Sequence, residues 1–352
     1  MAVARRGLLE RLKSGEDVLV AEGYMFEFAR RGYLSRGSYV PEVVLEHPDL
    51  VRAMHNEFVH AGSDVVLAFT YYGHRKGLKK IGKEDDVTKL NKQALQIARE
   101  VAYETGSLFA GGICHTRVYD EDDPKAVAEA REMFKEMIQW AVEAGTDYII
   151  GETFDLFGEA MLALDCIKMY GKGQPAVITL VAYCPDMTVD GVPIPEACRR
   201  LEEAGAVVVG INCARGPQTM IPLLKEIRTT CKGPIAALPV TFRCYENCRT
   251  FYNIKDSETG KNLYPSNLES ARCNSEDITK FGEEAKSIGV QYIGLCCGNC
   301  ALLMRDLAES YGRSPEACRY SIKMELSEVH GEDAAKINRY SKRTKEFMAG
   351  LV

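Results

Sequence analysis

Three cysteines are the residues of this chain whose type and spacing could do chemistry. Cys213 ends one apolar run, and the adjacent pair Cys296 and Cys297 ends another. If both runs are strands of one closed barrel, their ends converge around its axis. Three thiolates there could hold zinc and leave a fourth tetrahedral position open, and sulfur ligands suit zinc in a reducing compartment. The alternative is packed core cysteines; an adjacent pair followed by Gly298 favours the metal site.

A second cysteine pattern, Cys297-Gly-Asn-Cys300, has the spacing of a redox pair or of half a zinc ribbon. A ribbon needs a second pair, and Cys244-x₃-Cys248 matches poorly. The chain has 13 cysteines, and free cysteines are usually small buried residues. We expect that packing role for Cys114, Cys184, Cys198 and Cys231.

Polar and aromatic residues also stand where apolar runs end. Carboxylates such as Glu22 and Glu152 are costly there unless they are used. They could bind a substrate ammonium or act as acid and base, and a buried salt bridge is the alternative for either one. A cage of nearby rings would attract an onium ligand, although each ring could equally be packing. These rings are Tyr24, Phe26, Tyr39, Tyr71 and Tyr72.

Eight apolar runs must position these residues. They are continuous, as in parallel strands covered on both faces: Val18–Gly23, Val65–Tyr72, Leu108–Cys114, Tyr148–Phe154, Val177–Tyr183, Val207–Cys213, Ile235–Val240 and Tyr292–Cys297. Helical patterns separate them, and four end in a glycine just before a run, at Gly62, Gly145, Gly205 and Gly289.

This repeat predicts an α/β fold, a (β/α)₈ TIM barrel with its chemistry at the C-terminal strand ends. A doubly wound open sheet is the alternative. That fold normally has a Gly-rich phosphate loop after its first strand, and Ala21-Glu22-Gly23-Tyr24 is not one.

Helix signals and histidines complete the local pattern. Asp123 precedes Pro124 as an N-cap, and Ser275 is the expected cap of the helix before the eighth strand. His115 follows the third strand and could touch substrate. The histidines of the helical stretch after residue 46 are expected at the surface or as caps: His47, His55 and His60.

Two stretches do not fit the repeat. Residues 241–274 form a long polar segment between strands seven and eight, which we expect to be an ordered insertion near the site. In the tail, an apolar stripe among Lys and Arg indicates a helix folded back on the barrel or an oligomerisation arm: Ile337, Tyr340, Phe347, Met348 and Leu351. We therefore predict a barrel over residues 1–318 and a helical tail over 319–352.

Composition limits the function classes. The 352 residues carry a net charge of −6, which gives no support for nucleic-acid binding. No run approaches a membrane span, and the N-terminal segment lacks the apolar core of a signal peptide. We expect a cytosolic protein with no nucleic-acid or membrane partner.

These residues resemble the homocysteine S-methyltransferase family, and its betaine-dependent members most. Gly210-Ile-Asn-Cys213 and Cys296-Cys297-Gly298 resemble the family's zinc signature. The resemblance runs from about residue 7 to about 312, and the tail matches poorly. Supporting matches are Arg31-Gly-Tyr33, Pro41-Glu42, Glu46-His-Pro48, Phe69-Thr-Tyr-Tyr72, Gly111-Gly112 and the strand of Glu152.

The resemblance implies a zinc enzyme that methylates homocysteine without cobalamin. Cys213, Cys296 and Cys297 would be the zinc ligands, Glu152 would help to bind homocysteine, and Tyr72 would line the site. Tyr39 stands where a donor-stacking aromatic is found. We take Glu152 and Tyr72 as catalytic residues, with substrate bound by Glu22, Gly23, Tyr24, Tyr39, Tyr71, Tyr72, Glu152 and Thr153.

The chain also departs from the family pattern. Glu22-Gly23-Tyr24 replaces Asp-Gly-Gly, so the carboxylate is longer and a permissive glycine becomes aromatic. Tyr39 replaces a tryptophan, Thr153 a tyrosine and Leu295 a glycine. These differences alter the pocket and concern the identity of donor and acceptor.

We therefore predict a zinc-dependent S-methyltransferase that acts on two small molecules, an onium donor and a thiol. The first expectation is glycine betaine and homocysteine, giving methionine, in a homo-oligomer built through the tail. The same chemistry with S-methylmethionine, dimethylsulfoniopropionate or another thiol is the alternative. A barrel zinc hydrolase, which usually uses His or carboxylate ligands and a water, and a thiol-rich metal-storage protein are the rivals.

Overall fold

The computed structural model describes residues 6–35, 37, 39–327 and 339–350. It divides into two compact units, residues 1–315 and 316–352, which are described separately.

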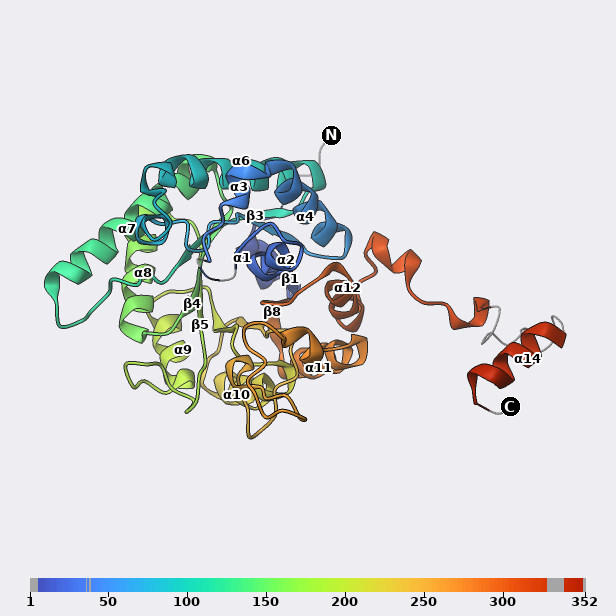
Figure 1. Cartoon of the computed structure of the whole chain (residues 1–352). Coiled ribbons are helices and arrows are strands. Elements are labelled where there is room, and N and C mark those ends of the chain that lie inside the picture. The colour runs from blue at the N-terminus through green and yellow to red at the C-terminus, as the bar shows by residue number, and fades with distance from the viewer. Residues whose placement is uncertain (1–5, 36, 38, 328–338, 351–352) are drawn as a thin grey trace. The chain divides into compact units, whose positions relative to one another are not determined.

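The first unit is a closed barrel of eight parallel strands in sequence order (Figure 1). This confirms the predicted (β/α)₈ fold. The strands are β1 (Val18–Ala21), β2 (Val65–Leu67), β3 (Leu108–Cys114), β4 (Tyr148–Phe154), β5 (Ala176–Leu180), β6 (Val208–Asn212), β7 (Ile235–Leu238) and β8 (Val290–Leu295). The last strand pairs with the first, with Val20 opposite Gly294, so the ring has no free edge.

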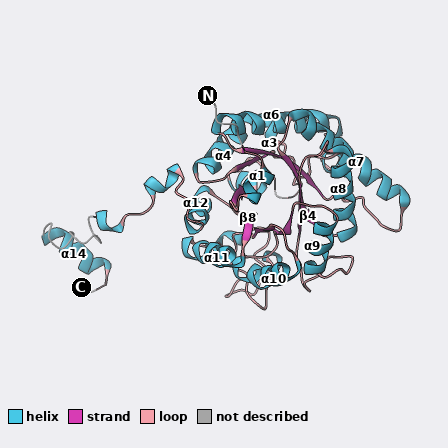
Figure 2. Cartoon of the chain, turned by 180° about the vertical axis from the view of Figure 1, so that it is seen from behind, coloured by secondary structure: helices cyan, strands magenta, loops and turns pink. Residues whose placement is uncertain are grey.

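Helices surround the barrel, most of them in an outer ring that is clear from both sides (Figures 1 and 2). They are α1 (Leu8–Lys13), α2 (Tyr24–Arg30), α3 (Val43–Glu46), α4 (Pro48–His60), α5 (Arg75–Lys79), α6 (Val87–Thr105), α7 (Pro124–Ala144), α8 (Phe157–Tyr170), α9 (Ile194–Glu203), α10 (Pro217–Thr230), α11 (Ser275–Ile288) and α12 (Ala301–Ser310). Both faces of each strand are therefore covered, which explains the continuous apolar runs.

Most strands end earlier than the apolar runs predicted, because the chain leaves the hydrogen-bonded sheet before the run ends. β2 ends at Leu67 although its run continues to Tyr72, and β6 ends one residue before Cys213. Tyr72 and Cys213 have left-handed φ angles of 54° and 61°, far from the φ of a regular strand.

Local signals set the helix ends. The Asp123 side chain accepts from the Lys125 amide at 2.9 Å, as predicted for an N-cap. The predicted cap Ser275 is wrong by one residue, because Asn274 caps α11 in a capping box with Asp277. The four glycines before strands all have positive φ, as their helix-ending role requires: Gly62, Gly145, Gly205 and Gly289.

One histidine lies elsewhere than expected. His47 and His60 are exposed, but His55 is buried on the inner face of α4. Its ring meets Tyr24 edge-to-face at 5.1 Å, and neither ring nitrogen has a hydrogen-bond partner among the described residues. Burial lowers its pKa to about 3, so His55 is a neutral core residue.

The segment over residues 241–274 is an ordered loop between β7 and α11. It holds two short 3₁₀ turns, Phe251–Asn253 and Leu268–Ala271. Its buried side chains include Phe242 and Phe251, whose rings stack at 5.9 Å. The loop is therefore attached to the barrel through a small apolar core of its own.

The second unit holds two short 3₁₀ turns, Glu316–Tyr320 and Met324–Leu326, and helix α14 (Arg339–Met348). Phe347 and Met348 of the predicted stripe are exposed. Ile337, Leu351 and the side chain of Tyr340 lie outside the described residues. Among the described helices of both units, none has the length and apolar character to cross a membrane.

Candidate active site

A cavity of about 370 Å³ opens at the C-terminal ends of the strands. All the site residues predicted from the sequence line it: Glu22, Gly23, Tyr24, Tyr39, Tyr71, Tyr72, Glu152, Thr153, Cys213, Cys296 and Cys297. They come from the ends of five strands, β1, β2, β4, β6 and β8, or the segments that follow them, and from the segment around Tyr39. The barrel thus brings together residues that are up to about 275 positions apart in the chain.

The three cysteine sulfurs form one cluster. Cys213 Sγ lies 3.6 Å from Cys297 Sγ, and Cys296 Sγ lies 3.9 Å from Cys297 Sγ. All three sulfurs are within 4.8 Å of one another. Sulfurs at about 2.3 Å from a tetrahedral zinc ion would be about 3.8 Å apart. The spacing therefore fits three corners of a zinc tetrahedron, and it is far too long for a disulfide.

Backbone hydrogen bonds to the end of β7 hold the cluster. The Cys213 amide donates to Leu238 O at 2.9 Å, and the Cys296 amide donates to Pro239 O at 2.8 Å. Thr241 N in turn donates to Cys297 O at 3.0 Å. Since β7 lies between β6 and β8, one segment fixes the positions of all three cysteines.

Gly23 makes room for the cysteine pair. Its φ is +83°, and a Cβ there would lie 2.2 Å from Cys296 O. Any side chain at this position would push the β8 loop away from β1. Asn299 closes the same contact, because its side-chain amide donates to Glu22 O at 3.3 Å and Leu295 O at 3.4 Å.

The cluster favours one thiolate when it binds no cation. Hydrogen bonds from the thiols of Cys296 and Cys297 hold the pKa of Cys213 well below its ordinary value. The same contacts, first of all with Cys213, raise the pKa of Cys296 and of Cys297. A cation is therefore needed to bring all three sulfurs to the thiolate form.

Glu22 and Glu152 are buried beside the cysteines without a cationic partner. Burial raises the pKa of Glu22 to about 8 and that of Glu152 well above its ordinary value, and the charge of Cys213 adds to both effects. Glu22 Oε1 has no hydrogen-bond partner among the described residues. Among the described residues neither carboxylate has an ion-pair partner, so the structure does not bear out the salt-bridge alternative for either.

Asn212 orients this pair of carboxylates. Its Nδ2 donates to Thr153 Oγ1 at 2.7 Å and to Glu22 Oε2 at 3.3 Å, and its Oδ1 accepts from the Thr153 amide at 3.0 Å. Thr153, which follows Glu152, has a φ of +62°. Such strained residues cluster at functional sites, and of the seven described non-glycine residues with positive φ, five line the cavity: Tyr39, Tyr72, Arg117, Thr153 and Cys213.

A group of tyrosines lines another side of the cavity, and the sequence analysis missed most of it. Tyr39 Oη lies 2.6 Å from Tyr264 Oη, and the rings of Tyr252 and Tyr264 meet at 4.9 Å. Tyr183 follows β5, 6.1 Å from Tyr252 between ring centres. The long loop thus supplies Tyr252 and Tyr264, and the expectation of an insertion near the site was the only signal for them.

Tyr72 lies in a polar chain at the ends of β2 and β3. Its Oη is 2.7 Å from His115 Nε2, and Arg117 donates to the same oxygen from Nε at 3.1 Å and from Nη2 at 2.7 Å. Burial lowers the pKa of His115 to about 3, so the neutral ring accepts the Tyr72 proton. The sequence analysis had named His115 but not Arg117.

The other cysteines lie outside this cluster. All 13 are free, and Cys300 is not within reach of the three sulfurs, so neither a disulfide nor a four-cysteine ribbon is formed. Cys114, Cys198 and Cys231 are buried as predicted, whereas Cys184 is exposed, and its predicted packing role is wrong. Its sulfur contacts Arg215 at 3.8 Å.

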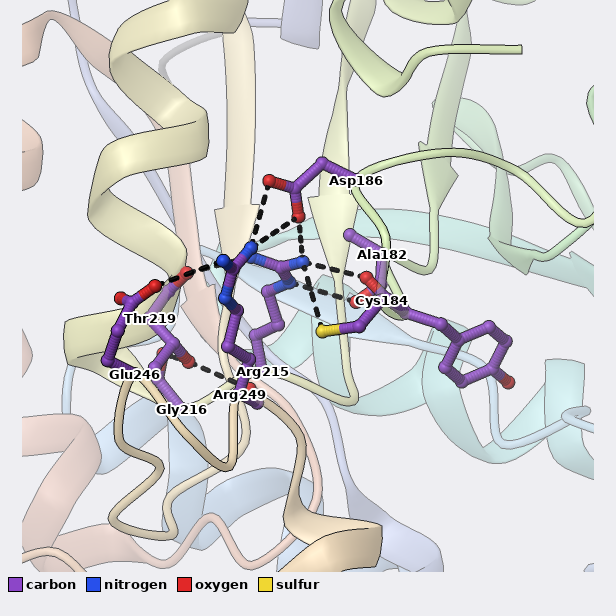
Figure 3. Close-up of polar contacts among 9 residues, drawn as sticks. Ala182, Cys184, Asp186, Arg215, Gly216, Thr219, Glu246 and Arg249 are labelled. Atoms are coloured by element: carbon purple, nitrogen blue, oxygen red, sulfur yellow. Dashed lines mark hydrogen bonds and ion pairs between the residues drawn. The ribbon is translucent and has the colours of Figure 1, made fainter. Parts of the chain in front are cut away.

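Arg215 was also missed, and it anchors the loop that carries Cys213 (Figure 3). Its buried guanidinium donates to Ala182 O at 3.0 Å, Thr219 O at 3.2 Å and Tyr183 O at 2.7 Å, and it pairs with Asp186. Its backbone amide donates to Cys213 O at 2.6 Å. One side chain therefore ties the β5 and β6 loops together behind the cluster.

Comparisons with known proteins agree with this site. Residues 21–311 match the sequence profile of homocysteine S-methyltransferases. The S-methylmethionine–homocysteine S-methyltransferase of Pongo abelii is 33% identical over 348 residues, 96% of this chain and 89% of that protein. Betaine–homocysteine S-methyltransferase 1 of Xenopus tropicalis is also 33% identical, over 96% of this chain and 82% of its own length. The family profile ends at residue 311, close to the end of the barrel unit.

A solved structure shows the same fold. A homocysteine methyltransferase from Escherichia coli, in its metallated form, superposes with a TM-score of 0.67 over 86% of this chain and 99% of that one. The two sequences are 18% identical, so this likeness concerns the fold.

Replacing Arg215 should lower the stability of the barrel more than replacing its neighbour. In Arg215→Met, Asp186 and the three carbonyls lose a buried partner, which should reduce the free energy of unfolding by about 3–5 kcal/mol. Arg249 pairs with the same Asp186 from a more exposed position, so Arg249→Met should cost less than about 1 kcal/mol. Urea unfolding measures both, and equal losses would contradict the anchoring role of Arg215.

Proposed function

This chain belongs to the homocysteine S-methyltransferase family, and we propose that it is a zinc-dependent enzyme that moves a methyl group from a small onium donor to the thiol of homocysteine. The observation that carries the proposal is the cluster of Cys213, Cys296 and Cys297 inside a cavity that also holds two unpaired carboxylates and a group of tyrosines. Each part suits one element of this reaction: the thiol, the ammonium of the acceptor and the cationic donor.

The sulfur cluster would hold the zinc ion. When bound, zinc supplies a Lewis acid that keeps the acceptor thiol deprotonated near neutral pH. The spacing of the three sulfurs supports this role, and three protein ligands leave a position for substrate. We also propose a cytosolic location, because the thiols must stay reduced; fractionation of cells would test it.

The carboxylates would bind the ammonium group of homocysteine. Glu22 and Glu152 flank the cluster, and no described cation neutralises them. An ammonium between them would favour their ionised forms and fix the amino acid relative to its sulfur. Glu22 Oε1 is buried and has no hydrogen-bond partner among the described residues, so it would gain a hydrogen bond from the ammonium.

The tyrosines would hold the donor. Cation–π attraction favours an onium group over their rings, and Tyr39, Tyr252 and Tyr264 form such a surface beside the cysteines. In the reaction the bond from methyl carbon to the onium atom breaks and a carbon–sulfur bond forms, so the donor leaves without its positive charge. Tyr72, fixed by His115 and Arg117, would position the donor from the other side and is our second catalytic candidate beside Glu152.

The rival functions receive less support. The cluster of His115, Asp155 and Glu159 has ligand atoms within 4.8 Å and could suggest a hydrolytic metal site. However, Glu159 Oε1 already accepts from the Thr116 amide at 2.7 Å and its hydroxyl at 2.5 Å, and Arg117 lies 3.7 Å from Asp155. A cation already occupies this place, so a zinc hydrolase is not favoured.

A methyl-transfer screen tests the donor and the acceptor. Glycine betaine, S-methylmethionine, dimethylsulfoniopropionate and choline would each be combined with homocysteine and the zinc-loaded enzyme, and methionine would be measured. We expect turnover with at least one carboxylated onium donor. Relatives named for two donors are equally similar to this chain, so S-methylmethionine is tested beside betaine, the first expectation from the sequence. No methionine from any pair would overturn the proposed substrates.

Removing one cluster thiol should remove the metal. Cys213→Ser should lower zinc content from about one ion per chain to less than about 0.2, with loss of methyl transfer, since a serine hydroxyl is a poor zinc ligand. Cys300→Ser is the matched control, because Cys300 lies nearby in sequence but outside the cluster, and it should retain its zinc. Metal analysis that finds full zinc in Cys213→Ser would refute the ligand assignment.

We also propose that the tail, residues 319–352, mediates homo-oligomerisation. Its described part exposes apolar side chains, among them Ile322 and Leu326, which a partner surface would cover. Light scattering should show an oligomer for the whole chain and a monomer for residues 1–315. A monomeric whole chain would argue against this role.

A further inference from the structure

Arg117 is the one permanently cationic side chain among the described residues that line the cavity. It follows β3 directly and has a left-handed φ of +63°, which is unfavourable for a residue with a side chain. The protein therefore maintains a strained backbone to present a guanidinium to a cavity that also contains the buried carboxyl groups of Glu22 and Glu152.

The guanidinium is only partly used by the protein. Its Nε and Nη2 edge donates to Tyr72 Oη, a neutral oxygen that leaves the positive charge in place. Nη1 lies 3.7 Å from Asp155 Oδ2, beyond hydrogen-bond distance, and has no other acceptor among the described residues. Apart from this ion pair with Asp155, the end of the fork, Nη1 with the second hydrogen of Nη2, makes no hydrogen bond to a described residue, and this edge matches a carboxylate.

Arg117 lies across the barrel from the cysteine cluster. In the ring of strands, β3 is three positions from β6 and three from β8, the two strands that carry the cysteines. A thiol at the cluster, with its ammonium at Glu22 and Glu152, belongs to the acceptor. A carboxylate at Arg117 therefore belongs most simply to the other substrate.

We propose that Arg117 determines donor specificity by binding the carboxylate of the methyl donor, so that the enzyme uses carboxylated onium compounds and discriminates against choline-like ones. This inference rests on the proposed methyl transfer. Tyr72 acts with it as a positioning residue, because its hydroxyl holds the Nε edge of Arg117 and turns the free edge to the cavity.

Steady-state kinetics of Arg117→Gln test the proposal. The loss of a charge-assisted carboxylate contact should lower kcat/KM for the best carboxylated donor roughly 10- to 100-fold, mainly through KM. The KM for homocysteine should change less than about twofold. Choline has a hydroxyl in place of the carboxylate, so its rate should not fall. Arg117→Lys, which keeps the charge but loses the fork, should recover part of the affinity.

The control is Arg75→Gln, which removes an exposed arginine that pairs with Glu136 on the outside of the barrel and should leave all constants unchanged. A rise in the KM of homocysteine instead of the donor would assign the carboxylate to the acceptor and overturn the proposal, as would equal losses for carboxylated donors and choline. Calorimetric titration of glycine betaine and S-methylmethionine into the zinc-loaded unaltered enzyme and into zinc-loaded Arg117→Gln measures donor binding apart from turnover. A failure of this inference can therefore be told from a failure of the proposed function. If the unaltered enzyme shows no turnover, the proposed function fails, and unchanged or absent donor binding overturns the role of Arg117.

Discussion

The candidate site depends on the backbone at the end of β7. Leu238 O and Pro239 O accept from the amides of Cys213 and Cys296, so two strands that flank β7 present their sulfurs at a spacing set by main-chain geometry. Neighbouring strands are about 4.8 Å apart, so β6 and β8, with β7 between them, are about 9.6 Å apart. The 3.6 Å between Cys213 Sγ and Cys297 Sγ is reached because both loops turn inward. Gly23 permits that turn, since only a residue without Cβ fits against Cys296 O.

Several ionisable groups in the cavity have few or no partners of opposite charge among the described residues. Buried ionisable groups are normally paired, because an unpaired one costs several kcal/mol. Here Glu22, Glu152 and the cysteine cluster share one region without a cation, while Arg117 stands at the opposite side of the ring with half of its fork unused. In the proposed function these groups are complementary to an ammonium at one end and a carboxylate at the other, which is the charge pattern of small zwitterions. These buried groups therefore lower the stability of the barrel in return for a preformed site, as in other active sites.

The sequence analysis recovered the elements that obey a period and the residues that end them. Eight buried strands and the glycine-ended helices before them can be recognised from local sequence alone. Cys213, Cys296 and Cys297 could be placed together because the strand ends of a barrel converge. Tyr252 and Tyr264 could not be placed, since a 34-residue loop has no period and its course depends on the packing of Phe242 and Phe251. Arg215 and Arg117 were not singled out, because local sequence does not show burial or hydrogen-bond partners that come from other loops. His55 was misplaced for the same reason: one apolar neighbour, Tyr24, comes from a distant helix.

One end of the site is formed by strand termini and the other by loops, and this difference limits which residues can change without disturbing the barrel. The acceptor end consists of strand termini, where Asn212 connects Glu22 to Thr153 and β7 fixes the cysteines. A change there disturbs the barrel itself. Two residues at this end, Tyr24 and Thr153, differ from the family pattern. Both contact the supporting structure, because Tyr24 packs on His55 and Phe58 and Thr153 is hydrogen-bonded to Asn212. The donor end consists of loops that carry their own small core, so tyrosines can be exchanged without moving a sulfur. Under the proposed function, this division would let one acceptor chemistry be combined with several donors, and the choice of donor in this chain would fall to the tyrosines and Arg117.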